Sequence, residues 1–262
     1  MREGIRLYGR YVSISVRSTM EYKASFFLNA MGQFLVSFNV FLGILFLFQR
    51  FSAVAGFTYS QVLLCFSVFL MEFTLAESIA RGFDTFSGMV RKGEFDRVMV
   101  RPRGLVFQVL GSRFELARIG RMLQAVVMFV YGVTNSGIHW NGAKVATVVF
   151  MLVGGTGLFF GIFLISASLC FFTMEGLEIM NIFTDGAREY GKYPVNVYGK
   201  RICQFCTFLV PYALVQYYPL LYLLDERTQW WWVFVPLLAL LFLIPSGMLW
   251  RVGVRRYQSS GS

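Results

Sequence analysis

The sequence predicts an all-α membrane protein with six transmembrane helices, an N-terminal amphipathic interfacial helix and both termini in the cytoplasm. Three observations predict this fold class: six long apolar stretches, Lys and Arg concentrated in alternate gaps between them, and a hydrophobic fraction of 56%. A soluble domain of this composition would have too little polar surface. Stretches of about 20 residues, at about 1.5 Å per residue, cross about 30 Å of hydrocarbon. They run over residues 26–48, 59–80, 105–133, 145–172, 202–224 and 230–250.

The distribution of basic residues predicts the orientation. Of the 24 Lys and Arg residues, 21 lie before the first stretch, in the second and fourth gaps, at the start of the third stretch or in the C-terminal tail. Only Arg50, Lys144 and Arg227 lie on the other side. Cytoplasmic segments carry the excess of Lys and Arg, so both termini are expected to be cytoplasmic. The net charge of +10 then faces anionic lipid headgroups, and we expect no nucleic-acid partner.

Residues 1–23 are predicted to form the interfacial helix. At about 100° per residue, Arg2, Arg6, Arg10 and Arg17 fall within one narrow sector, and apolar residues occupy the broad opposite side. A helix of this kind lies in the plane of the membrane interface. The segment is too polar for the apolar region of a signal peptide, so the first span is expected to be retained.

Polar side chains within the first two spans are candidates for a substrate pathway. The first span carries Gln33 and Asn39, and amides inside a span usually face other helices. The second span carries Glu72 and Glu77, and a carboxylate in hydrocarbon faces protein or water, or is protonated. Glu77 is near the cytoplasmic end and can reach the interface. The deeper Glu72 is therefore the stronger candidate for a functional or structural pairing.

The cytoplasmic gap 81–104 is the densest polar block of the chain. Glycines punctuate it and a proline ends it, and residues 94–100 are predicted to form a short helix between them. Phe95, Val98 and Met99 would lie on one face of this helix. A short exposed helix with mixed charge and an apolar stripe suits docking to a separate soluble protein. The alternative is a solvated loop held at the headgroups.

The third stretch is unusual because its first half is charged. Arg113, Glu115, Arg118 and Arg121 occupy that half, and only 122–133 is cleanly apolar. About 12 residues give about 18 Å, which is short of a full crossing. We expect the cytoplasmic half to project beyond the bilayer or to line a wet cavity, with Glu115 able to pair with Arg118 one turn on.

The last three spans carry residues that control helix packing and bending. In the fourth span, Gly157 and Gly161 form a G-x-x-x-G motif, which permits close approach of another helix. The fifth and sixth spans each carry two prolines, which kink helices. These are Pro211, Pro219, Pro236 and Pro245. No strong internal repeat is visible, which disfavours a transporter built from inverted halves.

Residues for catalysis or metal binding are not apparent. The single histidine, His139, is expected on the external side, and H-E-x-x-H and G-x-S-x-G motifs are absent. The segment 186–192 matches G-x-x-x-x-G-K but lacks the Ser or Thr that would ligate magnesium, and Pro194 follows almost at once. We therefore expect no catalytic residue, no metal, no cofactor and no nucleotide site in this chain.

Two ordered motifs resemble a known family over nearly the whole chain. K-G-E-F-D-R-V-M-V-R-P at 92–102 is similar to the G-x-[LF]-D-x-x-L-x-R-P segment of type-2 ATP-binding-cassette (ABC) exporter permeases. Y-P-V-N-V-Y at 193–198, with F-L-V-P-Y-A at 208–213 and Y-Y-P at 217–219, resembles a bacterial subfamily of these permeases formerly of unknown function. One departure is Gly199, where the subfamily is expected to have proline.

The resemblance implies a permease subunit of the bacterial cytoplasmic (inner) membrane. Its partners would be two copies of a cytoplasmic ABC ATPase, which would hold ATP and Mg, a second permease copy or a paralogous six-span permease, and membrane lipids. The ATPase-coupling residues implied are Glu94, Phe95, Asp96, Arg97, Val98 and Met99. The interfacial-helix residues are Arg2, Arg6, Arg10 and Arg17. The pathway candidates from the residues themselves are Glu72, Asn39 and Gln33.

The predicted organisation has three parts. The interfacial helix covers 1–23, and the six-span domain covers 24–250, with a coupling loop at 81–104 and a second cytoplasmic loop at 174–201. A cytoplasmic tail covers 251–262, whose final Ser-Ser-Gly-Ser resembles an engineered linker.

The substrate and two alternative functions stay open. Spans rich in Phe and poor in charge suit a drug, a lipophilic cation or a lipid-like molecule. A proton-coupled secondary transporter would instead use Glu72 as its proton site. A membrane scaffold would use residues 94–100 only to recruit a cytoplasmic partner.

Overall fold

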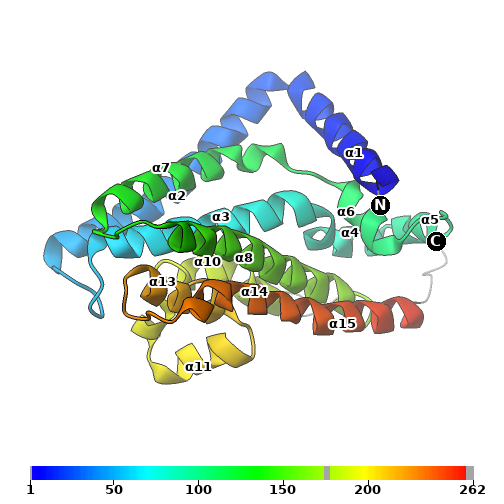
Figure 1. Cartoon of the computed structure of the whole chain (residues 1–262). Helices are drawn as coiled ribbons and strands as arrows, with labels where there is room; N and C mark the ends of the chain where they lie inside the picture. The colour runs from blue at the N-terminus through cyan, green and yellow to red at the C-terminus, as the bar shows by residue number, and fades with distance from the viewer. Residues whose placement is uncertain (1, 174–177, 258–262) are drawn as a thin grey trace.

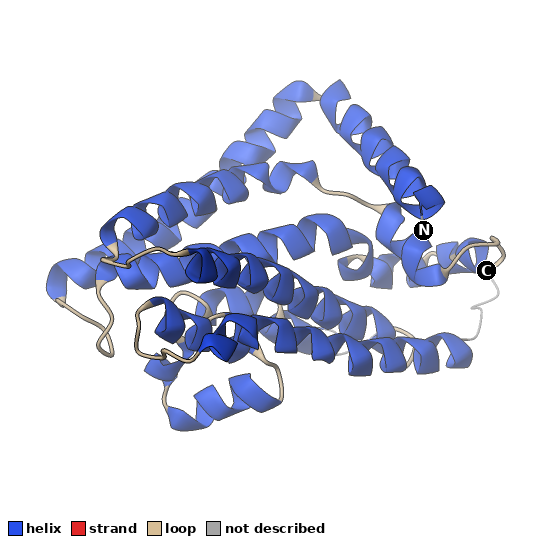
Figure 2. Ribbon diagram, viewed as in Figure 1, coloured by secondary structure: helices blue, strands red, loops and turns tan. Residues whose placement is uncertain are grey.

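The computed structural model describes residues 2–173 and 178–257. Helices make up 81% of the structure, with no strand among the described residues, which confirms the all-α prediction (Figures 1 and 2). The long helices are α1 (Arg2–Glu21), α2 (Lys23–Arg50), α3 (Tyr59–Asp84), α7 (Ile119–Asn135), α8 (Gly142–Leu169) and α15 (Leu243–Arg256). Residue 1, residues 174–177 of the second predicted loop and residues 258–262 of the predicted tail lie outside the described residues.

Short helices connect the long ones. Between α3 and α7 lie α4 (Phe86–Arg91), α5 (Glu94–Met99), α6 (Leu105–Ser112) and the 3-10 helix η1 (Leu116–Arg118). After α8 come α9 (Glu178–Phe183), α10 (Asp185–Tyr190), η2 (Val195–Tyr198), α11 (Lys200–Phe208), α12 (Tyr212–Val215) and α13 (Tyr217–Leu223). Before α15 come η3 (Trp230–Phe234), α14 (Val235–Leu238) and η4 (Ala239–Phe242).

Five helices of the described chain are long and apolar enough to cross a membrane. They run over Lys23–Arg50, Tyr59–Arg91, Leu116–Asn135, Gly142–Leu169 and Trp230–Arg256. A sixth is counted only if Lys200–Phe208 and Tyr212–Leu223, bent by 87° to each other, form one span. Pro211 lies at this bend, where its ring and missing N–H interrupt a helix. The predicted fifth span is thus a broken one or a re-entrant loop.

The third predicted stretch, 105–133, is wrong as a continuous helix. Its chain is extended at Arg113 and Glu115, so α6 ends at Ser112 and a new helix begins at Leu116. The apolar part that remains belongs to α7. Glu115, Arg118 and Arg121, at and after this break, form ion pairs with α3 that are described below.

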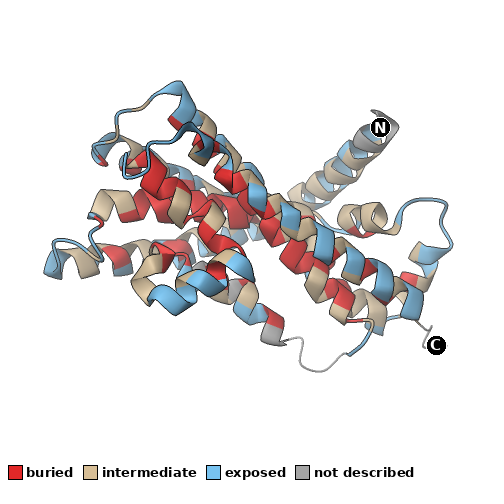
Figure 3. Ribbon diagram, turned by 60° about the horizontal axis from the view of Figure 1, so that its bottom comes forward, coloured by how far each residue is buried: buried red, intermediate tan, exposed pale blue. Residues whose placement is uncertain are grey.

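The centre of the bundle is α3, which packs against both α7 and α8. In the most apolar 18-residue stretch of this span, 83% of the residues are buried. In the corresponding stretch of α2, at the edge of the bundle, only 11% are buried. Figure 3 shows the buried residues concentrated along the middle of the bundle. A helix buried on every side is apolar around most of its surface, and α3 is apolar from Val62 to Met71 apart from Ser67.

The G-x-x-x-G segment of α8 is a packing site between helices, as predicted. A Cβ added to Gly157 would lie 2.3 Å from the Leu240 side chain, and one added to Gly161 would lie 3.0 Å from Phe242 and from Ser246. One turn earlier, a Cβ at Gly154 would lie 2.1 Å from the Pro236 carbonyl oxygen. The small residues of α8 therefore allow close contact with the last span.

Part of the chain between α8 and α11 packs inside the bundle. A Cβ added to Gly191 would lie 2.1 Å from the ring of Phe69, which is in the middle of α3. Gln216 Nε2 donates hydrogen bonds to the carbonyl oxygens of Gly191 at 2.9 Å and Tyr193 at 3.0 Å. The α10–η2 connection is therefore held against α3 and the bend near α12.

Candidate functional site

The predicted coupling segment forms a helix, α5, at one end of the bundle (Figure 1). Gly93 precedes it with a positive φ of 65°, a conformation that glycine adopts without a Cβ penalty. This residue turns the chain sharply between α4 and α5. The structure therefore confirms a short helix in the polar gap, ending at Met99.

Phe95 anchors α5 to the rest of the protein. Its side chain is fully buried, and its ring centroid lies 5.1 Å from that of Phe86, 5.4 Å from Phe171 and 6.4 Å from Trp250. Tyr257 completes this aromatic cluster, with its ring 5.1 Å from that of Phe95. Edge-to-face pairs of this kind stabilise a fixed arrangement of rings. The cluster joins α5 to α4, to the end of α8 and to α15.

The outer side of α5 is formed by different residues. Arg97 is exposed, Met99 is 38% exposed and Val100, which follows the helix, is 83% exposed. The sequence placed Phe95 and Met99 on one apolar face, whereas the structure turns Phe95 inward and Met99 outward. The surface available to a partner is thus smaller and more mixed than predicted.

A buried ion-pair network joins α2, α3 and α7. Glu77 accepts from Arg121 Nη1 at 2.6 Å and pairs with Arg118 Nη2 at 2.7 Å. Arg121 Nη2 donates to Gln33 Oε1 at 2.6 Å. Glu77 and Arg121 are both buried. Buried charges require partners of opposite sign and good geometry, and this arrangement supplies both.

A second layer of ion pairs surrounds this network. Glu115 Oε2 lies 2.7 Å from Arg81 Nε and 3.3 Å from Arg118 Nη2, and Arg81 also pairs with Asp84. The pairing of Glu115 with Arg118 was predicted, and the pairing with Arg81 was not. Three arginines and three carboxylates thus balance their charges within one region.

This network borders a polar cavity of about 350 Å³. Arg118 and Arg121 line it, so part of the charged half of the third stretch faces a polar cavity, one of the two outcomes expected from sequence. The cavity residues are Gln33, Val36, Phe73, Glu77, Arg81, Asp84, Arg118, Arg121, Phe163 and Thr184.

The three predicted pathway residues are not brought together. Gln33 belongs to the network, Asn39 is exposed on α2, and Glu72 is fully buried where α3 meets α8. A Cβ added to Gly155 would lie 2.1 Å from Glu72 Oε2. Neither carboxylate oxygen of Glu72 has a hydrogen-bond partner among the described residues. The sequence favoured Glu72 for pairing, whereas the paired carboxylate is Glu77.

The N-terminal helix packs on the element that follows the coupling segment. The rings of Tyr8 and Tyr11 lie 6.4 and 6.5 Å from that of Phe107 on α6. Arg6, Arg10 and Arg17 are exposed, and the side chain of Arg2 lies outside what the structure describes. The predicted helix therefore exists over Arg2–Glu21, and its place at a membrane interface stays a prediction.

Comparison with known proteins identifies the family. A family model described as "ABC-2 family transporter protein" matches residues 34–261, a range that includes α3, the coupling segment and the Glu77–Arg121 pair. No curated protein and no solved structure matches the chain. The match covers most of the chain and confirms the resemblance seen in the sequence. The chain is a multi-pass membrane permease that belongs to the ABC-2 transporter family.

Proposed function

We propose that this chain is the membrane-spanning permease subunit of an ATP-driven exporter, which forms the translocation pathway as a dimer and couples through α5 to a separate ATPase. Membership of the ABC-2 family implies pairing with an ABC ATPase. The observation that carries the proposal is the anchoring of Phe95. A helix that only recruits a partner has no need of a buried aromatic contact with α15 and with the turn that follows α8.

The aromatic cluster supports the transmission of movement from α5 to the membrane-spanning helices. A displacement of α5 by the ATPase is passed to the end of α8 through Phe171 and to α15 through Trp250, because close-packed rings move together. The two states of the ATPase then bias two arrangements of the spans. Arg97, Met99 and Val100 supply the exposed contacts on the other side of α5.

The proposal includes the assembly around the chain. Two ATPase copies bind on the cytoplasmic side and hold ATP and Mg, and this chain contributes no nucleotide site. The second permease is another copy or a paralogue. Both termini are cytoplasmic, α1 lies along the surface of the bacterial inner membrane with its arginines toward headgroups, and the cargo is a drug, a lipophilic cation or a lipid-like molecule.

The first test is purification of the tagged full-length chain from its native membrane in mild detergent. We expect a stoichiometric partner that carries G-x-x-x-x-G-K-[ST], and transport that requires ATP. A Val100→Asp variant should lose this partner, and Val100→Ala, the matched control, should keep it. A chain that purifies alone and moves its substrate with a proton gradient would overturn the proposal in favour of a secondary transporter. A partner without ATPase activity would favour a scaffold.

A further inference from the structure

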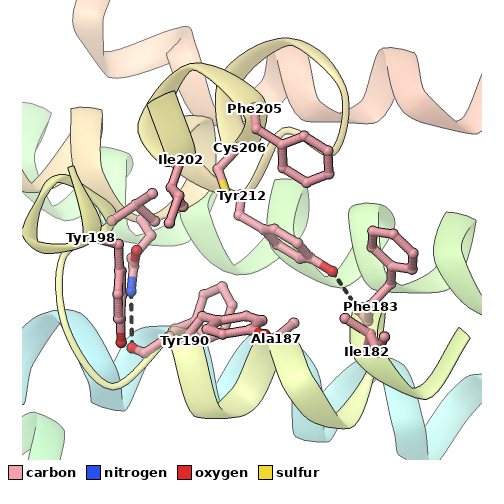
Figure 4. Close-up of a pocket in the computed structure, with 13 residues that line it drawn as sticks. Ile182, Phe183, Ala187, Tyr190, Tyr198, Ile202, Phe205, Cys206 and Tyr212 are labelled. Atoms are coloured by element: carbon pink, nitrogen blue, oxygen red, sulfur yellow. Dashed lines mark hydrogen bonds between the residues drawn. The ribbon is translucent and has the colours of Figure 1, made fainter. Parts of the chain in front are cut away.

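A second cavity, of about 300 Å³, has α9, α10 and η2 on one side and the bend between α11 and α12 on the other (Figure 4). Its walls come from α3, α9, α10, η2, α11 and α12 and are almost entirely apolar. None of the described residues that line it carries a formal charge. It is separate from the polar cavity, since the two share no lining residue. Its size is at the lower end of the range for small-molecule sites.

One polar group in this cavity has no partner. The Gln216 side chain is fully buried and lines the cavity, and both bonds of its Nε2 go to the carbonyls of Gly191 and Tyr193. These bonds fix the amide, so Oε1 is the remaining acceptor, and it has no hydrogen-bond partner among the described residues. Buried polar atoms are normally paired, so an orphan acceptor in an apolar cavity indicates a missing donor.

The Tyr212 hydroxyl also lines the cavity, and its hydrogen is already used in a hydrogen bond. The Tyr212 hydroxyl donates to the carbonyl oxygen of Phe183, as the dashed line in Figure 4 marks. A ligand therefore meets the unpartnered Gln216 Oε1, and carbon over most of the rest of the wall. The other polar atoms there are the hydroxyls of Tyr190, Tyr198 and Tyr212 and the Cys206 thiol. Such a wall favours a neutral molecule, because a charge placed there would be desolvated without a partner.

The entrance to the cavity is apolar as well. Tyr190, Ile202 and Phe205 line it and are 51%, 47% and 43% exposed. Such an entrance admits an apolar molecule more readily than a charged one, because a charge would lose its hydration there. The deep end is closed by Phe69, Ala187 and Gln216, all buried.

We propose that this cavity binds a neutral, mainly apolar molecule that donates one hydrogen bond, from a hydroxyl, to Gln216 Oε1. A hydroxylated bilayer component and a hydroxylated transported solute share this chemistry. Binding needs neither ATP nor a partner subunit, so it is tested separately from the proposed export function.

The test uses the full-length chain in lipid nanodiscs and a matched pair of probes, 2-naphthol and 2-methoxynaphthalene. The two have the same ring system, and only the first donates a hydrogen bond. Binding is measured by equilibrium dialysis against empty nanodiscs. We expect 2-naphthol to bind roughly tenfold more tightly, because it alone satisfies the buried acceptor. Equal affinity of the two probes would overturn the proposal.

A cavity-filling variant supplies the second arm. Ala187→Leu adds a side chain at the deep end, and Ala143→Leu makes the same change at an exposed position at the start of α8. The first should lose saturable 2-naphthol binding, and the second should bind as the original chain does. Unchanged binding by a folded Ala187→Leu protein would also overturn the proposal. If Ala187→Leu does not fold, the comparison of the two probes on the original chain still tests the proposal.

Mass spectrometry of molecules released from the purified chain distinguishes the two sources of the ligand, a bilayer component and a transported solute. A hydroxylated lipid that leaves with the original chain and is missing from Ala187→Leu identifies a bilayer component. A chain that releases no lipid and still prefers 2-naphthol identifies a solute.

Discussion

Glu77 of α3 and Arg121 of α7, 44 residues apart in the chain, form a buried ion pair with an N–O distance of 2.6 Å. Arg121 also donates to Gln33, so the pair ties α2 to the centre of the bundle. The pair adds to the apolar packing of α2, which buries Ile44 in a core cluster shared with α3 and α7. Removing one member of such a pair leaves the other charge buried without compensation.

Glu77→Gln should therefore destabilise the protein by roughly 3–5 kcal/mol, the range seen when one partner of a buried pair is removed. Glu72→Gln, the same substitution on the same helix, should change stability by less than about 1 kcal/mol, because Glu72 has no ion pair to lose. Thermal or denaturant unfolding of both variants in one detergent measures the difference. Similar losses for the two variants would mean that the Glu77 network is not a stabilising feature.

Glu72→Gln also tests the proposed pathway. If Glu72 compensates the charge of a lipophilic cation, the variant should lose efflux of that cation and keep basal ATPase activity of the reconstituted complex. The measurement is cation efflux from proteoliposomes, with ATP hydrolysis followed in the same sample. Unchanged efflux would remove Glu72 from the pathway and leave it as a residue buried between α3 and α8.

The sequence predicted local features of the site better than its long-range pairings. The charges of 105–133 correctly predicted the Glu115–Arg118 pair and a polar cavity beside part of that stretch, and Gly93 and Pro102 correctly predicted the short helix between them. The partner of Arg121 was not predictable, because the choice between Glu72 and Glu77 depends on the register of α7 against α3. A single sequence carries no signal of that register.

The packing of the α10–η2 segment was missed for a related reason. Its mixture of Tyr, Gly, Pro and Lys is typical of a surface loop. Its burial depends on Gly191 meeting Phe69 and on Gln216 meeting two of its carbonyl groups, and these contacts come from segments distant in sequence. The apolar cavity that results was equally invisible in the sequence.

Phe95→Leu should separate binding of the ATPase from coupling. Leucine keeps an apolar side chain and loses the edge-to-face contacts with Phe86 and Tyr257, so α5 stays folded but is held less rigidly. We expect the partner to co-purify as before and the amount transported per ATP hydrolysed to fall several-fold. Phe107→Leu, outside the cluster, is the control. Loss of the partner in Phe95→Leu would instead place Phe95 in the docking surface.

The contact between α8 and the last span can be tested with two glycines. A Cβ at Gly154 would lie 2.1 Å from the backbone carbonyl of Pro236, which cannot move without shifting the helix, so Gly154→Ala should destabilise by roughly 1–3 kcal/mol. A Cβ at Gly247 of α15 would meet no atom within 4 Å, so Gly247→Ala should stabilise by about 0.5–1 kcal/mol through its better helix propensity. Unfolding temperatures in detergent give both values. Effects of the same sign and size would show that α8 and the last span are not in the close contact described.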